Sequence, residues 1–194
     1  MPHPQTRILA FAGSTRKDSF NKKLVRAAAQ GATDAGALVT VIDLKDLPLP
    51  LFDEDMEKAQ GHPEACKTLK KLMVESDGFL IASPEYNSSI SAVLKNAIDW
   101  VSRPAPGEGS LAAFKGKVAG IMAASPGGTG GLRGLVHLRS ILGNIGVIVL
   151  PDQVTLPSAG EAFGPDGTLT DAKKREQVAA LGKTVASVAG KLKA

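Results

Sequence analysis

Five short, continuous apolar runs, separated by longer amphipathic stretches, constrain the fold of this chain more than any other feature. Runs of this kind are typical of strands buried on both faces, as in a parallel sheet. The stretches between them carry apolar residues at helical spacing. The alternation predicts an α/β fold, an open five-stranded parallel sheet with helices on both faces. The predicted strands are 7–12, 38–43, 78–83, 117–125 and 147–151, and the predicted helices are 20–36, 63–77, 91–102, 131–144 and 170–193.

Length and composition predict one domain covering residues 1–194. Charges of both signs are mixed along the chain and the net charge is only +4, so we expect no nucleic-acid partner. The single cysteine, Cys66, excludes an internal disulfide, and the three histidines are scattered, so we expect no metal site. No apolar run is long enough for a membrane span or typical of a signal peptide. Together these features predict a soluble, cytoplasmic protein.

The loops that follow the predicted strands are the places to look for a ligand site. In open parallel sheets, ligands bind beyond the carboxyl ends of the strands, near the point where the strand order reverses. Residues 152–169 are rich in Gly and Pro, and we expect an irregular surface excursion there. The strand-end loops are 13–20, 44–62, 84–90, 125–131 and 152–169.

The first of these loops, AGSTRKDSFNKKL, has the composition of a phosphate site. Hydroxyl and amide groups and Arg16 precede a helix N-terminus, where free N–H groups and the helix dipole favour an anion. The glycines of the Walker and dinucleotide motifs are missing, and Asp43 is better explained as a turn residue than as a ribose ligand. The loop therefore suits a mononucleotide such as FMN. Alternatively, Asp18, Ser19 or Asn21 only caps the next helix.

The third loop lies in SPEYNSSISAVLKNAIDW. Pro84 ends the strand, because proline has no N–H to donate. Glu85, Tyr86 and Asn87 then fall at the carboxyl edge of the sheet, beside the first loop. Backbone N–H groups there can bind the polar edge of a flat heterocycle, and the tyrosine can cover its apolar part. The alternative is a polar turn in which Asn87 and Ser91 cap the helix.

Together with SPGGTGGLR at 125–133, these two loops resemble the NADPH-dependent FMN reductase family, a flavodoxin-like group that includes chromate, quinone and azo-dye reductases. The resemblance runs from about residue 7 to residue 150. It implies a flavodoxin-like three-layer sandwich that binds FMN non-covalently. The matched positions are Ser14, Arg16, Ser19 and Asn21 for the FMN phosphate, Pro84, Glu85, Tyr86 and Asn87 for the ring, and Ser125, Gly127 and Gly128 for the loop that closes over it. One departure is Ser91, where the family often has proline.

The resemblance also implies an activity. A nicotinamide (NADPH or NADH) would pass hydride to FMN, and a quinone, chromate, azo compound or flavin would then take the electrons in a ping-pong mechanism. No catalytic side chain is required, because the cofactor carries the chemistry; Glu85 either transfers a proton or pairs with Arg133. A homodimer or homotetramer is expected, with helices 94–100 and 135–142 as candidate contacts. The alternatives are a flavodoxin-like electron carrier or flavin-binding module that does not use NAD(P)H directly, and a protein that has lost flavin.

Overall fold

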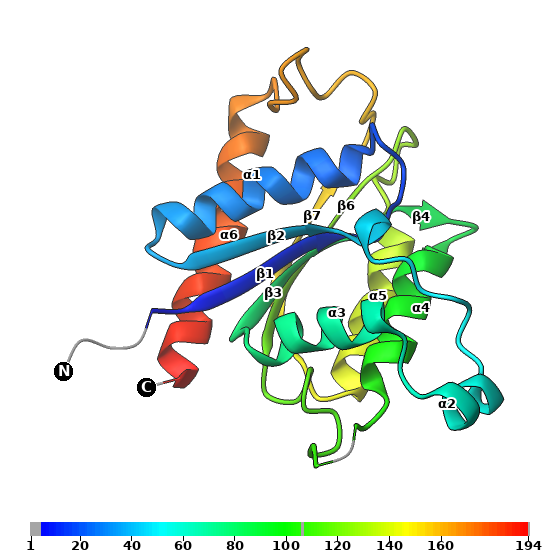
Figure 1. Cartoon of the computed structure of the whole chain (residues 1–194). Coiled ribbons are helices and arrows are strands. Elements are labelled where there is room, and N and C mark those ends of the chain that lie inside the picture. Colours follow the sequence, from blue (N-terminus) through cyan, green and yellow to red (C-terminus); the bar gives the residue numbers. More distant parts are fainter. Residues whose placement is uncertain (1–4, 106, 194) are drawn as a thin grey trace.

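The computed structural model describes residues 5–105 and 107–193. Its main feature is a five-stranded parallel sheet in the order β2-β1-β3-β6-β7 (Figure 1). The predicted α/β fold with a five-stranded parallel sheet is therefore confirmed. The strands are β1 (Arg7–Ala12), β2 (Leu38–Asp43), β3 (Gly78–Ala82), β6 (Val118–Ala124) and β7 (Ile148–Leu156).

Helices cover both faces of this sheet, and each face has its own apolar core. Alternate residues of a strand point to opposite faces, so Ile8 and Ala10 join one buried cluster while Leu9 and Phe11 join the other. The first cluster lies under α1 and α6, and the second lies under α3, α4 and α5 (Figure 1). These helices are α1 (Phe20–Asp34), α3 (Glu64–Val74), α4 (Ala92–Ser102), α5 (Leu132–Asn144) and α6 (Ala172–Lys193).

The segment 44–62 was expected to be a loop, but it contains two helical elements. A 3-10 helix, η1 (Leu44–Asp46), is followed by α2 (Glu54–Gln60). The side chain of Asp53 caps α2 by accepting from two backbone N–H groups of its first turn. None of the seven residues of α2 is buried. The helix therefore has no apolar stripe that the sequence could reveal.

Two predicted strands differ from expectation. The expected burial on both faces is wrong for β2, an edge strand whose Leu38 and Val41 are half exposed. The predicted end of the last strand at 151 is also wrong, because β7 continues to Leu156 and takes up part of the expected surface excursion. Its Pro151 lies where the pairing with β6 shifts register, on an edge strand. Proline is tolerated at such a position, because the N–H it lacks is not needed there.

The strand order decides where a ligand site can form. The order reverses between β1 and β3, which are neighbours although β2 separates them in the sequence. The loops that follow β1, β3 and β6 therefore leave the same edge of the sheet side by side, at a switch point of the kind where ligands bind in open α/β sheets. In the described part of the chain, no helix is long and apolar enough to cross a membrane.

Candidate functional site

The loops after β1, β3 and β6 enclose a small cavity of about 60 Å³ at this edge of the sheet. Most of the residues predicted to bind FMN line it, and they come from all three loops. The exceptions are Asn87, Gly127 and Gly128, which do not contribute to the lining. The lining consists of Ser14, Arg16, Ser19, Phe20, Asn21, Pro84, Glu85, Tyr86, Ala124, Ser125 and Pro126.

The start of α1 forms one side of the cavity and has the properties of an anion site. Ser19 is the N-cap residue, but within the described residues its side chain makes no capping hydrogen bond. Ser14 and Ser19 are both buried. Arg16 is exposed and forms no ion pair with any residue in 5–105 or 107–193. Two hydroxyls, a guanidinium and the free N–H groups of a helix start fit a phosphate dianion.

Asn21 also lines the cavity, but its side chain is engaged elsewhere. The Nδ2 group donates to the carbonyl of Ala124 at 2.9 Å, and Oδ1 accepts from the N–H of Ala124 at 2.9 Å. Asn21 is 3% exposed. The sequence suggested a phosphate contact or a helix cap for this residue, whereas the structure gives its amide a backbone partner 103 residues away.

The third loop forms a short hairpin of β4 (Glu85–Tyr86) and β5 (Ser89–Ile90). Asn87 and Ser88 make the turn, and both have positive φ, 50° and 64°. This is the two-residue turn that follows the twist of the strands. The hairpin holds Tyr86 about half exposed at the mouth of the cavity. The sequence did not reveal the hairpin, because its turn lacks the usual glycine.

The interpretation of Asn87 as a cap of α4 is wrong, whereas that of Ser91 is confirmed. The Ser91 hydroxyl accepts from the N–H of Leu94 at 3.2 Å and donates to the carbonyl of Gly13 at 2.6 Å. It therefore ties the start of α4 to the first loop. The two segments approach closely: a Cβ on Gly13 would lie 2.8 Å from that of Leu94.

Glu85 points toward the start of α5, and only 7% of its side chain is exposed. Its carboxylate pairs with Arg133 at 2.6 Å and accepts from the N–H of Gly134 at 3.0 Å. Burial raises the pKa of Glu85, but the Gly134 N–H and the Arg133 guanidinium together lower it below the ordinary value. Glu85 is thus a carboxylate near neutral pH, and the ion-pair alternative for this residue is confirmed.

The loop after β6 completes the site. Ser125 accepts from the N–H of Gly127 at 3.2 Å through its hydroxyl. A Cβ on Gly127 would meet nothing closer than 3.6 Å, and one on Gly128 would meet no described atom within 4 Å. The protein itself therefore does not require glycine at either position. Within this loop, the fold itself does require glycine at Gly130 and Gly131, which have positive φ and close neighbours.

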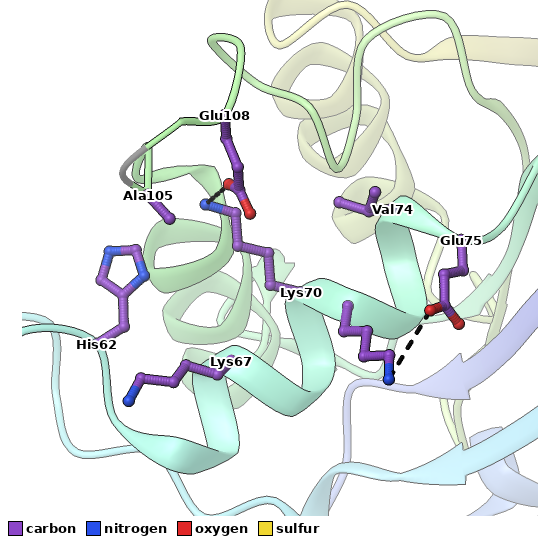
Figure 2. Close-up of a pocket in the computed structure, with 8 residues that line it drawn as sticks. His62, Lys67, Lys70, Val74, Glu75, Ala105 and Glu108 are labelled. Atoms are coloured by element: carbon purple, nitrogen blue, oxygen red, sulfur yellow. Dashed lines mark ion pairs between the residues drawn. The ribbon is translucent and has the colours of Figure 1, made fainter.

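A second pocket, of about 240 Å³, lies along α3 (Figure 2). Lysines line it, but each has a carboxylate partner: Lys70 pairs with Glu108 at 2.5 Å, and Lys67 and Lys71 pair with acidic residues of α3 and its C-cap. Figure 2 shows Lys70 and Glu108 pointing toward each other at its edge. Because these charges are compensated, the pocket is a weaker anion site than the cavity at the sheet edge.

Comparison with known proteins identifies the family. The sequence model of the NADPH-dependent FMN reductases matches residues 6–161. The chain belongs to this family. Membership confirms the predicted resemblance, and it makes the chain an FMN-dependent NAD(P)H oxidoreductase. The flavodoxin-like fold is confirmed as well, because the strand order β2-β1-β3-β6-β7 is the flavodoxin-like order 2-1-3-4-5.

Relatives cover nearly the whole chain. An NAD(P)H-dependent FMN reductase from Pseudomonas aeruginosa is 37% identical over 89% of this chain and 89% of its own length. An NAD(P)H:quinone oxidoreductase from Solanum tuberosum is 35% identical over 98% of this chain and 96% of its own length. Among solved structures, the flavoenzyme NAD(P)H:(acceptor) oxidoreductase FerB from Paracoccus denitrificans superposes with a TM-score of 0.78 at 29% identity, covering 96% of this chain and 98% of that one.

Proposed function

We propose that this FMN-dependent oxidoreductase takes hydride from NAD(P)H and passes the electrons to a quinone in a ping-pong reaction. The observation that carries the proposal is the convergence of three strand-end loops on one cavity at the switch point of the sheet. The names of relatives from Pseudomonas aeruginosa and Solanum tuberosum support an FMN reductase and a quinone reductase, respectively. We further propose that residues 1–194 form one domain. We also propose a cytoplasmic location, because the reaction needs reduced nicotinamide.

The cavity would hold the phosphate end of FMN rather than the whole cofactor. Its volume of about 60 Å³ is well below the range of about 300–1,000 Å³ of pockets that enclose a ligand. Ser14, Ser19 and the start of α1 would accept the phosphate, with Arg16 closing over it from outside. The ring would lie across the open surface between two loops, along Pro84, Glu85, Tyr86 and Asn87 on one side and Ser125, Gly127 and Gly128 on the other.

The bound FMN supplies a ring that accepts and releases hydride. The chain contributes binding and orientation. Glu85 keeps its negative charge and holds the start of α5 in place through Arg133 and Gly134. A proton-transfer role for Glu85 is disfavoured, because a carboxyl group with a lowered pKa is a poor acid near neutral pH. Tyr86, half exposed at the cavity mouth, would contact the second substrate.

We also propose that the protein is a homodimer that uses the exposed face of α5. Leu132 and Val136 lie one turn apart on this helix and are 45% and 59% exposed. The hairpin with the exposed Tyr86 packs beside the same helix. A second copy would bury these apolar groups and shield the open surface proposed for the ring. Val136→Glu should convert the dimer to a monomer in analytical ultracentrifugation; an unchanged sedimentation coefficient would contradict this assignment.

Two measurements test the proposed activity. Purified protein loaded with FMN should lose its flavin absorbance on anaerobic mixing with NADPH alone and regain it when a quinone is added. An electron carrier that does not use NAD(P)H would stay oxidised in the first step, and that outcome would refute the proposal.

The phosphate site is tested with Arg16→Ala. The variant should bind FMN about 10- to 100-fold more weakly, because a charged hydrogen bond is worth about 1.5–3 kcal/mol. Lys17→Ala is the matched control, since Lys17 is the next exposed cation but does not line the cavity. Equal losses in the two variants would mean that only general charge matters.

A further inference from the structure

The end of β6 carries two backbone groups that lose their strand partner. The N–H of Ser83 donates to the carbonyl of Met122 at 2.9 Å, just beyond the end of β3. Backbone groups of alternate residues point to the same neighbouring strand, so those of Ala124 face the same side as those of Met122. By the same alternation Glu85 would be the next residue to face β6, but the chain turns away after β3 and Glu85 pairs with Ile90 in the hairpin. Ala124 is 4% exposed, so its N–H and carbonyl need another partner.

Asn21 supplies that partner. Its amide donates to the Ala124 carbonyl and accepts from the Ala124 N–H, both at 2.9 Å, as a directly opposite residue of an antiparallel strand would do. On its other side, the end of β6 is held by β7, whose Leu156 carbonyl accepts from the N–H of Ser125 at 3.1 Å. The last residues before the closing loop are therefore fixed from both sides.

Asn21 is also joined directly to the phosphate side of the cavity. It is the second residue of α1, two positions after the buried Ser19. Its partner Ala124 immediately precedes Ser125, the first residue of the closing loop. One side chain thus sets the separation of two loops that both line the cavity.

We propose that Asn21 is a positioning residue that holds the closing loop (125–128) against the phosphate loop (14–19), rather than a ligand of the FMN phosphate. The inference rests on the proposed function. The contact depends only on protein atoms, so the two loops are already in register before the cofactor binds. Removing the amide would leave both backbone groups of Ala124 without partners and would release the closing loop.

Riboflavin separates positioning from phosphate binding, because it has the same ring as FMN but no phosphate. We expect Asn21→Ala to weaken binding of both flavins by about 10-fold, measured by fluorescence quenching. The control Arg16→Ala should weaken FMN binding and leave riboflavin binding almost unchanged. If Asn21→Ala affects FMN alone, or neither flavin, the positioning role is refuted. If the wild-type protein binds neither flavin, the proposed function fails instead.

Asn21→Asp provides a second test that also detects the hydrogen-bond geometry. A carboxylate accepts from the Ala124 N–H but cannot donate to its carbonyl, whereas a protonated carboxyl group does both. At about pH 8 the riboflavin affinity of this variant should therefore fall below that of the wild type, because the start of α1 favours the carboxylate and the Ala124 carbonyl then has no donor. Equal riboflavin affinity in the two proteins would contradict the inference.

Hydrogen exchange tests the inference without any substitution. In the wild-type protein freed of flavin, the N–H of Ala124 should exchange as slowly as those of the β6 interior, because Asn21 protects it. Exchange at the rate of an open loop would show that the contact does not exist before the cofactor binds, and would overturn the proposal.

Discussion

Ser91→Ala should destabilise the protein and loosen the flavin site together, although Ser91 does not line the cavity. Ser91 is only 2% exposed. Its hydroxyl makes two hydrogen bonds, one with α4 and one with the first loop. It caps α4 through the N–H of Leu94 and donates to the carbonyl of Gly13 in the first loop. Alanine removes both contacts and adds no new one.

The expected loss can be worked out from these two contacts. Removing a serine N-cap costs about 1 kcal/mol, within a range of about 0.5–2. Leaving a buried carbonyl short of a donor costs about 1–3 kcal/mol. Ser91→Ala should therefore lower the free energy of unfolding by about 2–4 kcal/mol. Ser91→Pro should lose about 0.5–1 kcal/mol less, because the φ of −69° at this position suits proline and proline restricts the unfolded chain.

Urea unfolding followed by circular dichroism measures these losses. Ser102→Ala is the matched control, since Ser102 lies at the other end of α4 and donates to the carbonyl of Asp99 within the same helix. It should cost less than about 0.5 kcal/mol, as such local bonds add little. If Ser91→Ala costs no more than Ser102→Ala, the bond to Gly13 is not stabilising and the reasoning fails.

Three further predictions concern single groups. The folded-state pKa of Glu85 lies below its ordinary value of 4.5, so the stabilisation that it provides through Gly134 and Arg133 is present above that value and is lost as the pH falls through the lower folded pKa. Glu85→Gln should therefore flatten the acid side of a plot of unfolding free energy against pH, measured by urea unfolding. Parallel plots for the variant and the wild type would contradict this. Burial raises the pKa of the Cys66 thiol to about 11, so a disulfide reagent at about pH 8 should label it only after denaturant is added; rapid labelling of the folded protein would argue against this burial. Ser88→Gly should raise stability by about 0.5–1 kcal/mol, because φ is 64° there and glycine adopts it without strain; a lower melting temperature in calorimetry would show that the serine side chain contributes more than the strain costs.

Most of the fold could be predicted because it rests on a local property, the continuous apolar run. The four strands that start at Arg7, Leu38, Gly78 and Val118 lie within one residue of their predicted bounds. The failures have physical reasons. The helix α2 buries nothing and so leaves no periodic pattern, and β7 continues past Pro151 because an edge strand at a register shift does not need that N–H.

The candidate site could be predicted at the level of loops but not of individual contacts. The donor-rich stretch with Arg16 and the loop with Tyr86 do meet at one cavity. Asn21 shows the limit: its side chain matched the donors expected of a phosphate loop, yet its amide bonds the backbone of Ala124. The sequence does not distinguish an asparagine whose side chain binds a ligand from one whose side chain hydrogen-bonds the backbone of a strand.

The sequence alone determined that five apolar strands alternate with helices, and that polar loops follow the strands at one edge of a parallel sheet. It also carried the motifs of the NADPH-dependent FMN reductases. Only the tertiary structure decided how those loops are joined. Asn21 bonds a residue 103 positions away, Ser91 one 78 positions away, and Glu85 one 49 positions away. Hydrogen bonds between residues so far apart in the sequence depend on which strands are neighbours in the sheet. The strand order decides this, and no local sequence pattern reveals it.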